Sequence, residues 1–329
     1  MAPQQVRMRS VLGLLALVAL SSPAAAADPY PTKPITILIP YGAGSLADLV
    51  PEVIQPALEA DLGQRILLDH RPGAGGNIGA DLVRLAAPDG YHLLLAATNN
   101  LVVNQYLYAG KMNFDPLTAF APVSMIVDVP LMITVNPALP AATMKEFVAY
   151  GRAHPGGINF GSPGPGTLPH LATEILGRAL GIKAVHVPYK GGGPAMAALL
   201  GGEIQFMFIG FGTVADPVRS GALRPIALAA DRRLSALPSL PTFAEAGFPN
   251  LGTPGNWWGL VAPAGTDPAI IDRLAAAVRK AVRSPEAQAK YARFGLLPVG
   301  STPAEFAARL PGEAAKWRKI VSELGLSLE

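Results

Sequence analysis

The stretch ITILIPYGAGSLADLVPEVIQPAL, residues 35–58, decides the fold class of this chain. The apolar, β-branched run at 35–40 predicts a buried strand, and apolar residues then recur at helical spacing. Pro51 would break a helix that began at Ser45, but it fits the first turn of a helix that is capped by Asp48. We therefore expect a strand, a glycine-containing loop and a helix that begins near Asp48.

Strand and helix signals alternate through the rest of the chain. Strands are predicted at 65–69, 92–97, 158–161, 184–188, 204–209 and 224–230, and helices at 77–86, 168–180, 194–200 and 213–219. Thr143 and Glu146 predict a capping box. Asp267 and Thr302 each precede a proline that suits the first position of a long helix near the C-terminus. This order predicts an α/β fold with parallel sheets covered on both faces, where ligands bind beyond the carboxyl ends of the strands.

The first 27 residues have the layout of a secretory signal peptide. Arg7 and Arg9 precede an apolar run at 11–20, and the small residues at 24–27 suit cleavage before Asp28. The apolar run is too short for a membrane span, which takes about 20 residues. The sequence contains no cysteine, which excludes a lipid anchor, a disulfide or a thiolate metal site. We expect an exported, soluble protein without a lipid anchor.

The charge balance does not favour a polyanionic partner. The 26 basic residues fall to 24 once Arg7 and Arg9 leave with the signal peptide, against 23 acidic residues. A nearly neutral chain without a run of Lys or Arg gives no reason to expect nucleic acid or an anionic membrane surface as partner. The mature length of about 300 residues suffices for two ordinary domains.

Four loops share one design, in which a strand leads through glycine and small polar residues into a helix. They lie at 41–45, 71–77, 161–167 and 189–194. Glycine lets the main chain approach an anion closely, and a helix N-terminus adds a favourable partial charge. The alternative for any single loop is that its glycines only turn the chain. A nucleotide cofactor is not expected, because Ile78 stands where a dinucleotide fingerprint needs glycine.

An exported hydrolase is the rival function. Thr98, Ser162 or Thr167 could act as nucleophile, but the sequence shows neither an evident base nor a serine elbow. The histidines show no metal-ligand spacing and no neighbouring carboxylate cluster, so we expect no metal site, and most of them at the surface or in loops: His70, His92, His154, His170 and His186. His170 is the exception, because it lies in the first turn of a helix that Thr167 can cap, next to a candidate anion loop.

Six stretches together resemble one protein family. They are YPTKPI at 30–35, PYGAGSLAD at 40–48, RPGAGGNIGA at 71–80, TLPHLA at 167–172, VPYKGGGPA at 187–195 and WGLVAPAG at 258–265. Each is weak by itself, but jointly and in this order they are specific. The sequence resembles, over essentially the whole mature chain, the periplasmic solute-binding proteins of tripartite tricarboxylate transporters, the Bug or TctC-like family.

The resemblance implies a type II periplasmic-binding-protein fold, with two α/β domains and a ligand carboxylate held in the cleft between them without a cofactor. The residues that it assigns to the first-domain grip are Tyr41, Gly44, Ser45, Asp48, Ala97, Thr98 and Asn99. Those that it assigns to the second-domain grip are Ser162, Gly164, Gly166, Thr167 and His170. Asp48 is expected to cap or organise its loop, because a carboxylate would repel a carboxylate ligand.

The sequence departs from the family pattern at two places. Gln205 and Ile209 stand where the family commonly has acidic residues, and the first loop has Gly42-Ala43 and Ser45 where prolines and a glycine are usual. Ile209 and Phe211 would make one wall of the pocket more apolar. We therefore expect a carboxylate with an apolar or aromatic body.

The resemblance also implies domain limits and partners. Residues 28–124 and 231–329 are expected to form one domain and residues 125–230 the other, with crossing strands near 123–128 and 225–230. The protein is expected to be a monomer that delivers its ligand to the membrane permease subunits of a tripartite tricarboxylate transporter. A solute sensor that docks on a membrane receptor is the alternative, because it would need the same cleft.

Overall fold

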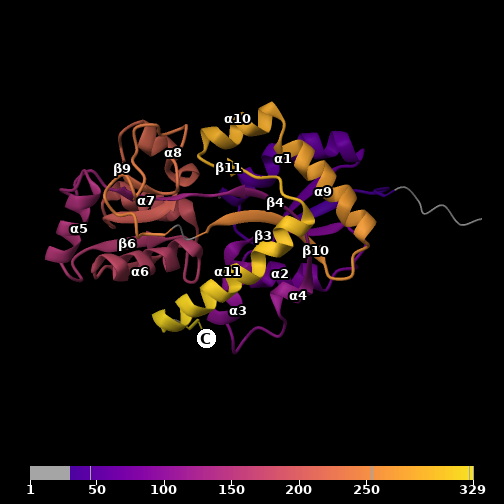
Figure 1. Cartoon of the computed structure of the whole chain (residues 1–329), viewed down its shortest axis with the longest axis horizontal. Helices are drawn as coiled ribbons and strands as arrows, with labels where there is room; N and C mark the ends of the chain where they lie inside the picture. The colour runs from indigo at the N-terminus through magenta and orange to yellow at the C-terminus, as the bar shows by residue number, and fades with distance from the viewer. Residues whose placement is uncertain (1–29, 45, 253–254, 326, 329) are drawn as a thin grey trace, which may run out of the picture.

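The computed structural model describes residues 30–44, 46–252, 255–325 and 327–328. The predicted signal peptide and Ser45 lie outside these residues. Two β-sheets, each covered by helices, lie side by side along the long axis of the molecule (Figure 1). Among the described residues, no helix is long and apolar enough to cross a membrane.

The first sheet contains six strands in the order β11-β4-β10-β3-β1-β2. Their bounds are β1 Ile35–Ile39, β2 Ile66–His70, β3 His92–Ala97, β4 Phe120–Asp128, β10 Trp257–Pro263 and β11 Leu297–Pro298. β1 runs parallel to β2 and β3, whereas β10 is antiparallel to β3 and β4, and β11 is antiparallel to β4.

The second sheet contains five strands in the order β7-β6-β8-β5-β9. Their bounds are β5 Leu131–Val135, β6 Asn159–Ser162, β7 Val185–Pro188, β8 Phe206–Gly210 and β9 Arg224–Ala229. β6 is parallel to β7 and β8, whereas β5 is antiparallel to β8 and β9. The α/β class is confirmed, but the expectation of parallel sheets is wrong. Both sheets are mixed, because β4, β5 and β10 are joined to the βα units by segments that pass between the sheets.

Helices cover both faces of each sheet, as expected. Those that pack on the first sheet are α1 Leu46–Leu62, α2 Asn77–Arg84, α9 Pro268–Val282, α10 Pro285–Arg293 and α11 Pro303–Leu324, with the short α3 Asn104–Leu107, α4 Pro116–Ala119, η1 Ala74–Gly76 and η2 Asn99–Val103. Those on the second sheet are α5 Met144–Ala153, α6 Leu168–Leu180, α7 Gly192–Gly201 and α8 Phe211–Arg219. The capping box at Thr143 forms as predicted, Asp267 and Thr302 cap α9 and α11 before a proline as predicted, and Thr302 also forms a capping box with Glu305. The helix α10 was not predicted.

The helix α1 begins earlier than the sequence indicated. It begins at Leu46 rather than near Asp48, and Pro51 lies inside the helix and is buried. A proline inside a helix costs about 3 kcal/mol through the lost N–H bond and the clash with the preceding turn. The helix persists because it buries seven residues against the sheet, and each large apolar side chain stabilises the fold by roughly 1.5–3 kcal/mol.

The chain crosses between the sheets twice. It passes from β4 to β5 through Val129 and Pro130, and it returns through the segment between β9 and β10. In that return segment Leu234, Leu240 and Phe243 pack in the cores of the second sheet. The predicted domain limits stay a prediction, and these contacts favour a second division that lies after residue 230.

Candidate functional site

The loops that carry the predicted site residues follow the carboxyl ends of neighbouring parallel strands. The β1–α1 loop (40–44) and the start of η2 at 98–99 follow β1 and β3, which pair in parallel in the first sheet. The β6–α6 loop (162–167) begins at the last residue of β6 in the second sheet. This is the edge at which ligands bind in α/β sheets.

Hydrogen bonds join three of the first-sheet loops. The Tyr41 hydroxyl donates to Asn99 Oδ1 at 2.7 Å, and Asn99 Nδ2 donates to the carbonyl oxygen of Gly75 at 2.7 Å. The Tyr41 ring meets Trp258 edge to face, with 5.1 Å between the ring centroids. Burial raises the pKa of Tyr41 above its ordinary value, so its hydroxyl is a neutral hydrogen-bonding group at neutral pH.

Asp48 organises the β1–α1 loop. Its Oδ2 accepts a hydrogen bond from the backbone N–H of Gly44, and its Oδ1 lies 3.6 Å from Nδ1 of His70. That ring nitrogen is also 3.1 Å from the carbonyl oxygen of Tyr41. Asp48 sits in the first turn of α1, so it is not the N-cap, but it holds the loop that precedes the helix.

Ala97 and Thr98 are tied into the framework. The backbone N–H of Ala97 donates to Asn100 Oδ1 at 2.8 Å. The Thr98 hydroxyl donates to the carbonyl oxygen of Gly255 at 2.9 Å and accepts from the N–H of Trp257 at 3.1 Å. Thr98 is fully buried, which is unfavourable for the nucleophile that the hydrolase reading assigned to it.

The β6–α6 loop is held by its own polar groups. The Thr167 hydroxyl donates to the carbonyl oxygen of Gly164 at 2.7 Å, and Ser162 Oγ lies 3.1 Å from the same oxygen. Ser162 Oγ also accepts from the N–H of Gly164 at 3.2 Å. Thr167 occupies the N-cap position of α6, but its side chain makes no capping bond, because its hydroxyl is used by the loop. Gly181 ends α6 in the left-handed conformation, as predicted.

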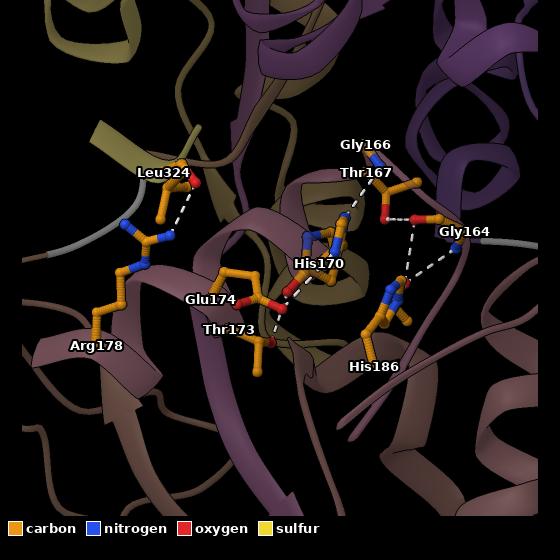
Figure 2. A network of polar contacts seen from close by, with 11 residues as sticks. Gly164, Gly166, Thr167, His170, Thr173, Glu174, Arg178, His186 and Leu324 are labelled. Carbon is orange, nitrogen blue, oxygen red and sulfur yellow. Dashed lines mark hydrogen bonds and ion pairs between the residues drawn. The ribbon is translucent and has the colours of Figure 1, made fainter. Parts of the chain in front are cut away.

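Two histidines lie beneath this loop (Figure 2). The N–H of Gly166 donates to Nδ1 of His170 at 3.1 Å, and His186 Nε2 lies 2.7 Å from Ser162 Oγ. The two imidazole rings stack at 3.8 Å between centroids, with 14° between their planes. The expectation that the remaining histidines are surface or loop residues is therefore wrong for His186, which lies on β7.

The pairing of β6 with β7 is the feature from which the histidine pair could have been predicted. Phe160 pairs with His186 across the parallel β6 and β7, and the Phe160 ring stacks on His186 at 4.9 Å. Predicting the β6–β7 pairing would have placed His186 beside the last residues of β6. His186 lies sixteen residues after His170 in the sequence, and this separation matches no local metal-binding or catalytic motif.

Both histidines are held neutral at pH 7. Burial lowers the pKa of His170, and burial together with the neighbouring His170 lowers the pKa of His186 to about 4. Nε2 of His170 is 4.0 Å from Oε1 of Glu174, whose own pKa is raised by burial. A neutral imidazole does not form an ion pair with this carboxyl group, so the 4.0 Å contact is not a salt bridge at pH 7.

The structure brings the loops of the two sheets to one tyrosine. A Cβ built at Gly75 in the β2–α2 loop (71–77) would lie 3.3 Å from the Tyr108 hydroxyl, and one built at Gly166 would lie 3.6 Å from it. Tyr108 directly follows α3. No sequence pattern indicates this residue, which lies between loops that are about 90 residues apart.

Ile209 does not lie with the first-sheet or the second-sheet loop residues of the candidate site. It is 2% exposed and packs with Met207 and Phe211 in a core beneath α7 and α8. Gln205, the other departure from the family pattern, uses Oε1 to accept from the N–H of Asn159 at 2.8 Å. Both side chains therefore serve the framework of the second sheet in this structure.

Among the residues that the structure describes, the site contains no recognisable metal centre or exposed catalytic pair. In the part of the chain that the structure describes, no three His, Asp or Glu side chains come together to hold a metal ion. Ser162 and His186 have the spacing of a nucleophile and its base, but Ser162 is 0% exposed and its hydroxyl is bonded to the loop. A buried serine with these contacts positions a loop rather than attacking a substrate.

Comparisons with known proteins agree with this arrangement. Residues 50–326 match the model of the tripartite tricarboxylate transporter family receptor. The solved structure of the periplasmic binding protein BugD is 29% identical, covers 91% of this chain and 99% of BugD, and has a TM-score of 0.83. This likeness confirms the predicted type II periplasmic-binding-protein fold with two α/β domains.

Two further similar structures are of proteins with a dicarboxylate, adipate or malate. Rpa4515 of R. palustris with adipate is 30% identical, with 91% of this chain and 99% of that chain covered and a TM-score of 0.85. MatC (Rpa3494) of Rhodopseudomonas palustris with bound malate is 29% identical, with 89% and 100% covered and a TM-score of 0.81. The chain belongs to the tripartite tricarboxylate transporter receptor family, whose members are periplasmic solute-binding proteins and not enzymes.

Proposed function

We propose that this protein captures a small carboxylate between its two α/β domains and delivers it to the membrane permease subunits of a tripartite tricarboxylate-type transporter. One observation carries the proposal. The β2–α2 loop of the first sheet and the β6–α6 loop of the second both approach Tyr108, so a ligand held there would contact both domains. A ligand that contacts both domains stabilises the closed form relative to the open form.

The proposed first-domain residues are Tyr41, Gly44, Ser45, Asp48, Ala97, Thr98 and Asn99. Tyr41 and Asn99 are joined to each other and to the β2–α2 loop, and they offer neutral polar groups to an anion. The contacts of Asp48 and Thr98 favour an indirect role, in which they hold the loops that present backbone N–H groups.

The proposed second-domain residues are Ser162, Gly164, Gly166, Thr167 and His170. They surround the N-terminus of α6, a helix of 13 residues. A helix N-terminus stabilises a nearby anion by about 0.3–1 kcal/mol at an exposed site and more when partly buried. Neutral donors and this partial charge can hold a carboxylate without a lysine or arginine at the ligand.

We infer that the ligand is a carboxylate with an apolar body. The adipate of one relative has such a body, whereas the malate of another carries a hydroxyl group, so the family accepts both kinds. The apolar kind is proposed here because positions 205 and 209 hold Gln205 and Ile209, which pack in the second-sheet framework and bring no charge towards a polar or cationic group of a ligand. We propose Ile209 as a supporting residue of the apolar wall, through its packing with Phe211.

A thermal-shift screen tests this function. The mature chain, residues 28–329, is heated with adipate, malate, longer aliphatic and aromatic acids, aspartate and glutamate. A ligand at 100 times its Kd stabilises the folded state by roughly 2.7 kcal/mol, which raises the melting temperature measurably. Calorimetry then gives the Kd of each acid that raises it.

Two variants separate site binding from general effects. Tyr41→Phe removes the hydroxyl that bonds Asn99 and should weaken binding of the acid. Tyr291→Phe removes a buried hydroxyl that donates to the Val50 carbonyl in the first-sheet core and should leave the Kd unchanged. Tight binding of aspartate or glutamate without binding of adipate or aromatic acids contradicts the apolar preference. Absence of a shift with every acid contradicts the proposed function.

A further inference from the structure

The stacked pair His170–His186 fixes both ends of the β6–α6 loop. Ser162, at the beginning of the loop, is bonded to His186, and Gly166, near its end, is bonded to His170 (Figure 2). The pair is itself held from one side by Phe160, which stacks on both rings at 4.9 and 6.3 Å between centroids. The position of the loop therefore depends on two rings that cannot turn independently.

The contact with Gly166 defines the protonation state of His170. A backbone N–H donates to Nδ1, so this nitrogen carries no proton, and the proton of the neutral ring lies on Nε2. Nε2 faces Glu174, with 4.0 Å to Oε1. A second proton would have to enter at Nδ1, where it would face the Gly166 N–H. Two donors would then oppose each other, and the hydrogen bond that holds Gly166 would be lost.

His186 acts on the other end of the loop. Its Nε2 is 2.7 Å from Ser162 Oγ, which also contacts both the N–H and the carbonyl oxygen of Gly164. A charge on either ring raises the cost of charging the other, because the centroids are only 3.8 Å apart. Titratable or charged groups near the pair include Glu174 and Arg178 on α6, Tyr189 after β7 and Tyr108 after α3.

We propose that His186 is a positioning residue for the carboxylate site and that the His170–His186 pair makes ligand binding sensitive to acid, because protonation of His170 at Nδ1 breaks the bond that holds Gly166 in the β6–α6 loop. The proposal rests on the proposed function of that loop. The loop is held when both rings are neutral, so affinity for a carboxylate is highest at neutral pH and falls as His170 is protonated.

Isosteric substitutions allow the charge to be removed while the hydrogen bonds are kept. Asn places an acceptor near the position of His Nδ1, and Gln places a donor near that of Nε2. The double variant His170→Asn, His186→Gln therefore retains both loop contacts without a group that titrates. His186→Phe retains the stacked ring and loses the contact with Ser162. His92→Gln changes an exposed histidine on β3 and serves as the matched control.

Calorimetry with adipate and malate at pH 7.5, 6.0, 5.0 and 4.5 is the first measurement. The ratio of wild-type to variant Kd cancels the ionisation of the ligand itself. The affinity of the double variant at pH 7.5 serves as the reference for its own pH profile, and His186→Phe should bind about tenfold more weakly than the wild type at that pH, the effect of one lost hydrogen bond. From pH 7.5 to 4.5 the wild type and His92→Gln should lose affinity relative to the double variant. Equal pH profiles for wild type and double variant would overturn the proposal.

Nuclear magnetic resonance tests the same proposal without a ligand. The imidazole nitrogens of His170 should report a proton on Nε2 alone at pH 7.5, and the Gly164 and Gly166 amide signals should shift in step with protonation of the pair. In the double variant these amide signals should not follow that titration. A proton on Nδ1 at pH 7.5, or unchanged amide titration in the double variant, contradicts the proposal. If neither acid binds the wild type, the carboxylate function fails for these ligands, and this experiment still decides the role of the pair.

Discussion

Arg178 on α6 holds Leu324, the last residue of α11, across the two halves of the molecule. Its Nη2 donates to the carbonyl oxygen of Leu324 at 2.8 Å (Figure 2). Its Nη1 donates to the carbonyl oxygen of Glu323 at 2.6 Å. The last carbonyls of a helix lack partners within it, and a cation there also suits the helix dipole. The end of α11, which packs on the first sheet, is thereby fixed to a helix of the second.

The residues after α11 continue this contact. The N–H of Leu328 donates to the carbonyl oxygen of Leu107 at 2.9 Å, and a Cβ built at Gly166 would lie 2.5 Å from Leu328 Cδ1. Figure 1 shows α11 running from the first sheet towards α6 and α3. The C-terminal segment therefore contacts both a first-sheet helix and the loop that we assign to the ligand.

Replacing Arg178 by leucine should loosen the connection between the two halves. The side chain is exposed and its two bonds are to backbone carbonyls, so the loss in free energy of unfolding should be about 1 kcal/mol. Urea unfolding measures this loss. The matched control is Arg152→Leu, which removes a bond to the Leu180 carbonyl within the second domain. Only Arg178→Leu should increase the radius of gyration of the ligand-free protein in X-ray scattering; an equal effect of both variants would contradict the proposed connection.

Gly166→Ala should impair ligand binding more than stability alone explains. Gly166 has φ 72°, and its new Cβ would lie 2.5 Å from Leu328 and 3.4 Å from Leu107. Gly156→Ala is the control, because Gly156 has φ 76° but has no heavy atom within 4 Å of an added Cβ. The control should lose about 1 kcal/mol of stability from backbone strain. Gly166→Ala should lose more free energy of unfolding and should raise the Kd for the carboxylate. An unchanged Kd would show that Gly166 does not belong to the binding site.

Tyr41→Phe should destabilise the first-sheet loops as well as weaken binding. It leaves Asn99 Oδ1, in a residue that is 5% exposed, without the hydroxyl donor. An unsatisfied buried acceptor costs about 1–3 kcal/mol. Tyr291→Phe should cost a similar amount, because its hydroxyl donates to the Val50 carbonyl in the core. Denaturant unfolding and calorimetry on both variants separate the shared loss of stability from the loss of affinity expected for Tyr41→Phe alone.

The sequence predicted those features that depend on neighbours along the chain. The capping box at Thr143, the end of α6 at Gly181 and the strand β3 follow from local spacing, and the structure contains them. The antiparallel position of β10 could not be predicted, because it depends on a strand that returns to the first sheet after the whole second sheet has formed. The start of α1 was misplaced because burial of Pro51 outweighs its local preference.

The sequence predicts which loops carry the candidate site but not which residues these loops contact. Gly166 and Thr167 were placed in an anion loop from the glycine pattern, whereas their partners are set by tertiary packing. The ring of His186 reaches His170 only because β7 pairs with β6 and α6 packs on β6. Similarly, Tyr108 meets Gly166 only through the packing of the two halves. Such distances are not encoded in any local spacing.

Stability should fall in mild acid through His186. Its pKa is lowered from 6.5 to about 4 in the folded protein, so below pH 6.5 the unfolded chain takes up a proton that the folded chain does not. This contribution is fully present above pH 6.5 and is lost as the pH falls towards 4. Partial solvent screening reduces the loss to roughly 1–3 kcal/mol. Urea unfolding at pH 7.5, 6.0 and 5.0 measures it.

His186→Gln should flatten this dependence, because glutamine does not titrate in that range. Some carboxylates, such as Glu305, have a pKa that is lowered by hydrogen bonds, and their contribution to the free energy of unfolding is lost only as the pH falls below their ordinary pKa of 4.5. These carboxylates therefore do not change the stability between pH 6.5 and 5. His92→Gln should retain the wild-type slope. If His186→Gln and the wild type lose stability equally between pH 7.5 and 5.0, the buried state of His186 in the stacked pair is not the source of the acid sensitivity.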